Sequence, residues 1–399
     1  MIDVNRAREV LRETVTDFGV ELIPLEESVG RVLREDWMAD RPMPPYDRVT
    51  MDGIAIRYTD YEAGTRTFEI AGIAAAGSPV MELTVADGCL EVMTGAILPD
   101  GTDTIIRYED VEMEEDKKQA TIATGVSVRA GQNVHGKGSD RLEGAVLCRT
   151  GKLIRAAEIG IGATIGKSMV KVSTLPKVVI VSTGDELVEI DQQPLPHQIR
   201  KSNVHRMMAS LRATGIIAER RHLNDDMVEI KSTLQSLLKE FDIILLSGGV
   251  SKGKFDFLPE ALDQVGVKKL FHKIRQRPGK PFWFGQHPNG TTVFAFPGNP
   301  VSSYMCHQVY FLPWLRASLG YPMPTLPYAE LTAPITFRPD LTYFAQVKIE
   351  YAPNGKLLAT PVQGNGSGDL ANLTDADGFL ELPEGKEAYL VGEVYGVWV

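Results

Sequence analysis

The spacing of apolar residues changes along the chain, and each change predicts a different kind of structure. Between Asp3 and Phe18 apolar residues recur at spacings of three and four, and Asp3 can cap the first turn. We therefore expect an amphipathic helix over residues 3–18 and a second, short helix around residues 29–35. The proline-rich segment 41–47 cannot continue a helix and indicates a boundary or an extended linker.

Short strand-like runs separated by Gly and Asp turns follow between residues 50 and 141, with little helical period. They predict a small β domain. The chain enters this domain through the proline-rich segment and leaves it through the glycine-rich residues 131–140. We therefore expect the β domain to be inserted into a unit that the N-terminal helices begin and the following residues complete.

Strands and helices alternate from residue 177 onward. This alternation predicts a parallel sheet covered by helices on both faces, with ligands bound beyond the carboxyl ends of the strands. Asn203 and either Asp225 or Asp226 are expected to cap two of the helices. The expected strands are residues 178–181, 216–221, 243–246 and 293–296.

The remaining part begins with the apolar residues 301–319, which predict a long helix. Asn299 is a natural N-cap for it and Pro300 suits its first position, so its N-terminus could attract an anion. From about residue 325 short strands and turns predict a small all-β domain.

The composition excludes several classes of protein. The 399 residues carry a net charge of −10 at pH 7, which argues against general nucleic-acid binding because that mode needs a basic surface. No apolar run reaches the ~18 residues that a membrane span needs, and the charged N-terminus is unlike a signal peptide. We therefore expect a cytoplasmic protein. The three cysteines are widely separated, which argues against disulfides and zinc sites.

A glycine-rich segment follows the expected strand 243–246 and has the pattern of a phosphate-binding loop. Gly248 to Lys254 spells G-x-x-x-x-G-K, but Phe255 stands where a P-loop NTPase needs a Ser or Thr hydroxyl. An ordinary NTPase is therefore disfavoured.

The same segment also matches the nucleophile elbow of hydrolases. Gly249 to Gly253 spells G-x-S-x-G, in which Ser251 would be the nucleophile. No oxyanion segment precedes it and lysines flank the serine, so a serine hydrolase is a distant alternative. Its partners would come from Asp263, His272, His287 and His307.

Charged residues gather around the same region. Lys273, Arg275 and Arg277 alternate, so on a strand they would share one face, and Lys280 follows them. A solvated edge strand is the less favoured alternative. Carboxylates near the expected strand exits favour Mg²⁺ over zinc. Together these residues predict a phosphorylated substrate with magnesium. The acids are Asp185, Glu186, Asp226 and Asp256.

Short motifs over most of the chain together resemble the molybdopterin molybdenumtransferase family (MoeA type, and the gephyrin E domain). Each motif is weak alone, but all occur in the family's order and spacing. They are Thr50-Met51-Asp52-Gly53, Met93-Thr94-Gly95-Ala96, Gly138-Ser139-Asp140, Ser182-Thr183-Gly184-Asp185-Glu186-Leu187, Ser247-Gly248-Gly249-Val250-Ser251, Pro278-Gly279-Lys280-Pro281 and Pro297-Gly298-Asn299-Pro300.

This resemblance implies a multidomain α/β and β fold. Its parts would be an α+β linking domain (1–46 and 141–175), an inserted β domain (47–140), a three-layer α/β molybdopterin-binding domain with a parallel sheet (176–324) and a C-terminal β-barrel (325–399).

The resemblance also implies an enzyme. A homodimer would insert molybdate into adenylylated molybdopterin, with Mg²⁺-dependent hydrolysis and release of AMP. An upstream molybdopterin adenylyltransferase and recipient molybdoenzymes are the partners to consider. The alternative is a non-catalytic pterin-binding or scaffolding protein of the same fold. The sequence does not distinguish molybdate from tungstate.

Individual roles follow by position from the same resemblance. Catalytic and metal-binding roles fall to Asp226, Asp256 and Glu186, and further catalytic roles to Asp52, Thr94 and Asp140, which would reach the site across the dimer. Substrate-binding roles fall to Gly248, Gly249, Ser251, Arg277, Lys280, Pro297, Gly298, Asn299, Pro300 and Ser367. Lys273 is added to them as a member of the alternating basic run. One departure is Gln346, where the family commonly has an arginine, because glutamine cannot bind an anion in the same bidentate way.

Overall fold

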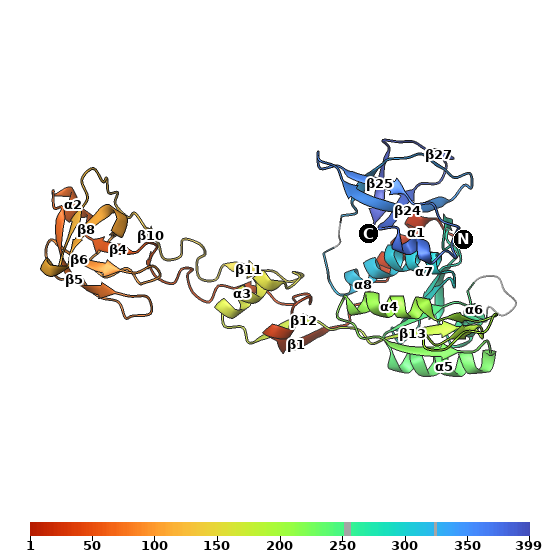
Figure 1. The fold of residues 1–399 in the computed structure, drawn as a ribbon. Coiled ribbons are helices and arrows are strands. Elements are labelled where there is room, and N and C mark those ends of the chain that lie inside the picture. The colour runs from red at the N-terminus through yellow and green to blue at the C-terminus, as the bar shows by residue number, and fades with distance from the viewer. Residues whose placement is uncertain (251–256, 323–324) are drawn as a thin grey trace. The chain divides into compact units, whose positions relative to one another are not determined.

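The chain folds into two compact units, which are described separately below. The structure is a computed structural model and describes residues 1–250, 257–322 and 325–399. The first unit comprises Met1–Glu35, Thr150–Ile159 and Met169–Val399, and the second comprises Asp36–Arg149 and Gly160–Ser168. The multidomain α/β and β fold expected from the sequence is confirmed (Figure 1).

The centre of the first unit is a sheet with the strand order β16-β13-β17-β21-β20-β18. The pairs from β16 to β21 are parallel, as predicted, and β20 and β18 add antiparallel strands at one edge. The strands are β13 (Val178–Thr183), β16 (Glu219–Leu223), β17 (Ile243–Ser247), β18 (Lys268–His272), β20 (Trp283–Gln286) and β21 (Thr292–Phe296). The strand predicted at residues 216–221 begins later than expected, at Glu219. Ile216 packs in the core before this strand starts.

Helices cover both faces of this sheet, and alternate strand residues point into two separate cores. Ile180 and Leu245 pack with α4 and α7, whereas Val181 and Leu246 pack with α5 and α6. Figure 1 shows α4 and α5 on opposite sides of β13. The helices are α1 (Val4–Glu13), α4 (Ser202–Arg212), α5 (Met227–Glu240), α6 (Leu258–Gln264), α7 (Pro300–Cys306) and α8 (Leu312–Ser318).

Helix ends test the predicted caps. Asp3 caps α1 as expected, but that helix ends at Glu13 rather than at residue 18. Asp226 caps α5 by accepting a hydrogen bond from the Glu229 amide. The prediction for Asn203 was wrong, because α4 begins two residues earlier, at Ser202, with Lys201 at the N-cap position.

The predicted helix 301–319 is continuous from Pro300 to Ser318, but its middle is wound as a π-helix over His307–Phe311. The aromatic side chains of this segment pack on the sheet: the ring of Phe311 lies 5.1 Å from that of Phe294. The helix is therefore fixed by core packing along its length.

A closed barrel forms the C-terminal part of the first unit. Its strands pair in the order β24-β25-β22-β28-β26, and β26 returns to β24. This agrees with the expected C-terminal β-barrel. The strands are β22 (Tyr328–Leu331), β24 (Thr342–Tyr351), β25 (Leu357–Pro361), β26 (Gly378–Leu382) and β28 (Val394–Trp398), with β23 (Ile335–Thr336) and β27 (Ala388–Tyr389) forming a separate pair and η5 (Ala371–Thr374) beside them.

The short helix predicted around residues 29–35 is absent from the described chain. Val32 and Leu33 are instead buried in extended backbone, bridged to Leu153 and Val172. Pairing with distant segments therefore overrides the local helical pattern here. The helices and strands of the chain not yet named here or in the second unit are β1 (Val20–Pro24), η1 (Leu25–Glu27), α3 (Ala156–Thr164), β12 (Met169–Ser173), β14 (Leu187–Val188), β15 (Ile199–Arg200) and β19 (Gln276–Arg277).

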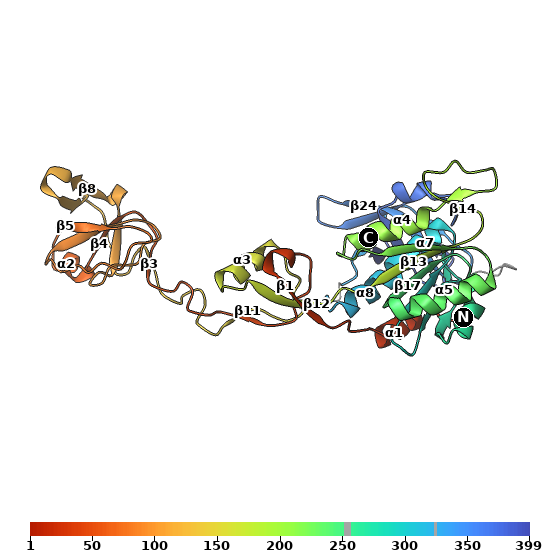
Figure 2. The same cartoon turned by 90° about the horizontal axis from the view of Figure 1, so that it is seen from below.

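The second unit is built on a sheet with the order β7-β4-β6-β5-β9-β8, in agreement with the predicted small β domain. Figure 2 shows this sheet with α2 beside it. Its elements are β2 (Trp37–Met38), β3 (Arg48–Val49), β4 (Gly53–Ile56), α2 (Tyr58–Glu62), β5 (Thr67–Ala74), β6 (Gly88–Val92), β7 (Thr104–Arg107), η2 (Tyr108–Asp110), β8 (Val111–Glu114), η3 (Glu115–Lys117), β9 (Gln119–Ile122), β10 (Val134–His135) and β11 (Val146–Cys148).

Two expectations from composition concern the whole chain. Cys89, Cys148 and Cys306 are all buried and none forms a disulfide. Within the described residues, no helix combines the length and the apolar character that a membrane crossing requires.

Candidate functional site

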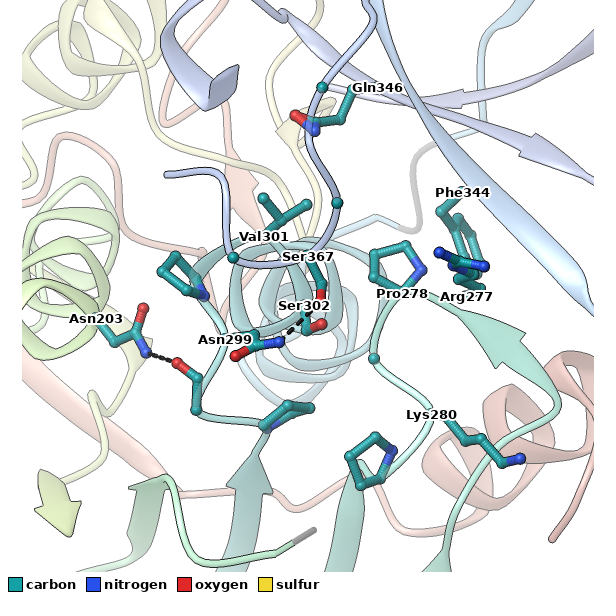
Figure 3. A pocket seen from close by; sticks show the side chains of 18 of the residues that line it. Asn203, Arg277, Pro278, Lys280, Asn299, Val301, Ser302, Phe344, Gln346 and Ser367 are labelled. Atoms are coloured by element: carbon teal, nitrogen blue, oxygen red, sulfur yellow. Dashed lines mark hydrogen bonds between the residues drawn. The ribbon is translucent and has the colours of Figure 1, made fainter. Parts of the chain in front are cut away.

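A cleft of about 1610 Å³ opens at the carboxyl ends of the parallel strands in the first unit. Loops after β13, β17 and β21 form one wall, and residues of the C-terminal barrel form another (Figure 3). The volume exceeds the ~1,000 Å³ upper range of sites for drug-sized ligands, so a long substrate can lie in it. Its position agrees with the ligand-binding edge predicted from the alternating strands and helices.

The first glycine loop follows β17 and lines the cleft. Gly248 has φ +105, and a Cβ there would lie 2.8 Å from Oγ1 of Thr183. Gly249 has φ +67, and its Cβ would lie 2.9 Å from the Leu258 side chain. Both positions therefore require glycine, and the backbone can come close to a ligand. Ser251 and Asp256 lie outside the described residues.

The second glycine loop, Pro297 to Pro300, follows β21 and also lines the cleft. Asn299 occupies the N-cap position of α7, but its amide donates to Oγ of Ser367 at 2.8 Å (Figure 3). The Val301 amide donates to the Ser367 carbonyl at 3.1 Å. The expectation of a helix N-terminus open to an anion is thus wrong for the Val301 amide, because a barrel loop already uses it.

A partly buried cation lies behind this second loop. Arg206 donates from one guanidinium nitrogen to the Pro300 carbonyl at 3.1 Å, and its planar head lies 5.0 Å from the Tyr304 ring centroid. Burial lowers the pKa of Arg206 to about 10, so it stays protonated at neutral pH. Its charge adds a positive potential under the loop.

The basic residues expected on one strand are not on one strand. β18 ends at His272, Lys273 adopts φ +70, and β19 begins at Gln276. Lys273 is not among the described residues that line the cleft. Arg275 pairs with Asp340 at 3.2 Å and with Glu384 at 3.1 Å. The prediction of a shared face was wrong because the left-handed backbone at Lys273 ends the alternation.

Arg277 and Lys280 do line the cleft, from the loop that Pro278 and Gly279 form between them (Figure 3). Both side chains are exposed. No carboxylate among the described residues lies within ion-pair distance of either. Two cations that face the cleft without an internal counter-ion can meet a phosphate or another oxyanion.

The predicted acids separate into two groups. Glu186 lines the cleft, and so does Asp225, which was expected only as an alternative cap. Asp226 is exposed and its Oδ1 accepts the Glu229 amide at 2.8 Å, so its carboxylate serves the helix end. Within the described residues no group of three His, Cys, Asp or Glu side chains could hold a metal ion by itself.

The predicted site residues of the second unit also form contacts. Asp52 accepts hydrogen bonds from the amide of Thr94 at 2.6 Å and from its hydroxyl at 2.7 Å, and these bonds lower the pKa of Asp52. Asp140 lies 2.9 Å from Nε2 of His135. Both acids are exposed.

The histidines considered for the hydrolase alternative are not arranged to act as a general base. His272 donates from Nε2 to the Val250 carbonyl at 3.2 Å, so this nitrogen cannot accept a proton from a serine. His307 is buried, and burial lowers its pKa to about 3. His287 lies in the turn after β20, where the Asn289 amide donates to its Nδ1.

The sequence reasoning missed several residues of the cleft. Lys201 lines it, and its ammonium pairs with Glu189 at 2.7 Å. Asn203, expected as a cap, donates from its side-chain amide to Oγ of Ser247 and to the Gly298 carbonyl. Gln346 lines the cleft on the barrel side and accepts a hydrogen bond from Asn372 at 3.0 Å. Asn203 had a sequence signal that capping explained equally well, Gln346 stood out only as a departure from the family, and Lys201 had no signal.

Comparisons with known proteins cover the whole chain. Sequence profiles match the MoeA N-terminal region (domain I and II) at residues 2–166, a probable molybdopterin binding domain at 179–317 and the MoeA C-terminal region (domain IV) at 328–399.

Two curated relatives are named molybdopterin molybdenumtransferase. The one from Synechocystis is 40% identical over 99% of both chains, and the one from Bacillus subtilis is 30% identical over 94% of this chain and 89% of its own. The solved structure of the molybdopterin biosynthesis MoeA protein from Pyrococcus horikosii has a TM-score of 0.85 and 28% identity, covering 100% of this chain and 99% of that one.

Proposed function

The chain belongs to the MoeA family of molybdopterin molybdenumtransferases, enzymes of molybdenum cofactor biosynthesis, and we propose that it acts on adenylylated molybdopterin and molybdate. Hydrolysis of the adenylylated substrate releases AMP, and molybdenum enters the dithiolene of the pterin. The observation that supports this most directly is the cleft itself, with two glycine loops on one wall and unpaired cations on another among its described residues.

The shape and charge of the cleft suit a substrate with several phosphates. Gly248, Gly249, Pro297, Gly298, Asn299 and Pro300 offer close backbone approach on one side, while Arg277 and Lys280 supply positive charge on the other. Molybdate is a further oxyanion, which accounts for more cationic side chains than one phosphate needs. Ser367 lies at the second glycine loop. Its hydroxyl accepts a hydrogen bond from the Asn299 amide and can still donate one to a ligand. We assign Ser251 to the same substrate by family position.

Magnesium is proposed as the metal because the described residues that line the cleft include carboxylates but no cysteine or histidine. Mg²⁺ commonly binds one or two carboxylates and completes its shell with phosphates and water. Glu186 and Asp225, which line the cleft, fit this pattern, and Asp226 follows directly after Asp225. Asp256 is proposed by family position. Bound there, Mg²⁺ supplies charge neutralisation for the phosphates.

We also propose a homodimer in which Asp52, Thr94 and Asp140 act in the partner subunit's cleft. The exposed carboxylates of Asp52 and Asp140 support this, because both are held in place while remaining accessible. The domain boundaries proposed are 1–46 with 141–175, then 47–140, 176–324 and 325–399. Light scattering of the purified protein tests the dimer.

The test of the activity is direct. The purified protein is mixed with Mg²⁺, adenylylated molybdopterin and molybdate, and AMP is followed by chromatography while active cofactor is followed by reconstitution of an apo-molybdoenzyme. We expect AMP release that depends on molybdate, stops with EDTA and returns with Mg²⁺. Tight binding of the pterin without molybdate-dependent AMP release would instead support a scaffolding protein. A parallel reaction with tungstate determines the preferred oxyanion.

A further inference from the structure

The two glycine loops lie against each other at the floor of the cleft. A Cβ on Gly298 would lie 3.9 Å from the Cα of Gly248, which places the two backbones side by side. β17 and β21 end at Ser247 and Phe296, and there the Gly248 amide still donates to the Phe296 carbonyl at 3.1 Å. Beyond this bond the regular pairing of the strands stops, so the two loops need another connection to keep their relative position.

Asn203, in the first turn of α4, makes that connection with its side chain. Its Nδ2 donates to the Gly298 carbonyl at 2.8 Å (Figure 3). The same nitrogen also donates to Oγ of Ser247 at 3.2 Å. One amide group therefore joins the last residue of β17, which the first glycine loop follows directly, to a residue of the second glycine loop. The orientation of this amide is fixed chemically, because the Gly298 carbonyl can only accept and must face the NH₂ group rather than the oxygen.

We propose that Asn203 is a positioning residue for the reaction, which holds the two glycine loops in register so that both contact the phosphorylated pterin substrate together. The inference rests on the proposed function, in which these loops bind that substrate. Asn203 acts through the loops and is not a catalytic residue. Losing its amide separates the loops and weakens the binding of the pterin substrate, whereas the cations Arg277 and Lys280 keep their positions on another loop.

The location of Asn203 argues against a merely structural role. The residue is only partly buried, lines the cleft and lies outside the hydrophobic cores. Asparagine is also a poorer helix former than leucine or alanine, so replacing it in α4 improves the intrinsic stability of the helix. A structural role would therefore predict little change in substrate binding after substitution.

The test compares Asn203→Leu, which has nearly the same shape but no donor, with Asn203→Ala and the wild type. We expect KM for adenylylated molybdopterin to rise about tenfold in both variants, while kcat and KM for molybdate change less than twofold. Asn203→Asp keeps the shape but places a carboxylate oxygen against the Gly298 carbonyl, so it should not rescue the wild-type KM. The midpoint of thermal unfolding should stay close to the wild-type value.

A matched control is Asn289, whose amide donates to the Leu238 carbonyl at the opposite end of the sheet. Asn289→Leu should lower the unfolding temperature and leave KM unchanged. Hydrogen exchange provides a readout independent of turnover: peptides that end β17 and β21 should exchange faster together in Asn203→Leu, and the peptide of β13 should not.

A wild-type KM and wild-type exchange in Asn203→Leu would overturn the inference, and so would an equal rise of both KM values. If the wild type itself releases no AMP, the proposed function fails, and the exchange measurement alone then decides whether Asn203 connects the loops.

Discussion

Gly279 is a position in the cleft lining where a single methyl group should cost stability. It has φ +81, and a Cβ there would lie 2.5 Å from Sγ of Cys306, 2.9 Å from Cε of Met305 and 3.0 Å from Nε2 of Gln276. The left-handed backbone costs a residue with a Cβ about 1–2 kcal/mol. Pressing a methyl group into a filled core costs about 1–3 kcal/mol more. Gly279→Ala should therefore lose roughly 2–5 kcal/mol of stability.

Gly290→Ala is the matched control, because Gly290, in the turn between β20 and β21, has φ +99 but no atom within 4 Å of its Cβ position. It carries the backbone cost without the steric one. With about 2–4 °C per kcal/mol for a domain of this size, Gly279→Ala should unfold at least roughly 2–4 °C below Gly290→Ala in thermal scans. It should also lose more turnover, because its loop carries Arg277 and Lys280. Equal unfolding temperatures for the two variants would refute this account of the loop.

Three further predictions concern single side chains. Arg277→Ala should raise KM for the anionic substrates by about 10- to 100-fold, because it removes a hydrogen bond from a charged group. Arg275→Ala is the control: it removes a cation that is paired with Asp340 away from the cleft, so KM should stay near the wild-type value. Burial lowers the pKa of His307 to about 3 in the folded chain, whereas in the unfolded chain the residue takes up its proton near pH 6.5. The free energy of unfolding should therefore fall as the pH drops from about 6.5 toward 3. Acid titrations followed by circular dichroism should show a smaller fall for His307→Phe. Cys89 and Cys306 are buried, and burial raises the pKa of both thiols, that of Cys89 to about 12. Iodoacetamide at pH 8 should therefore label both cysteines only after denaturation, as mass spectrometry can show.

The α/β layer could be predicted from the sequence because its signals are local. Every residue from Val178 to Thr183 is buried, so the apolar run identifies a central parallel strand without any knowledge of its neighbours. Asp226 is an equally local signal, since an N-cap acts on an amide only three residues away. Gly248 and Gly249 stood out for the same reason, because glycines directly after a strand indicate close backbone approach.

Predictions that depended on distant contacts fared differently. Residues 29–35 have a helical pattern, but Val32 and Leu33 find better burial by bridging to segments far along the chain. Asn203 looked like a cap because capping is the usual use of asparagine at a helix start. Its partners are Ser247, at the end of β17, and Gly298, in the loop after β21, and no local pattern connects either to α4.

The position of Arg277 shows why the cationic side of the cleft needs the C-terminal barrel. β19 is only Gln276–Arg277, too short to hold its own conformation, and it is fixed by parallel pairing with Thr342 and Tyr343 of β24. The guanidinium of Arg277 lies 6.0 Å from the ring centroid of Phe337, which stacks on Tyr343 with centroids 4.3 Å apart. The barrel therefore sets both the backbone and the side chain of this cation. Since the glycine loops belong to the α/β layer, a substrate that contacts both walls binds only when barrel and layer are held together.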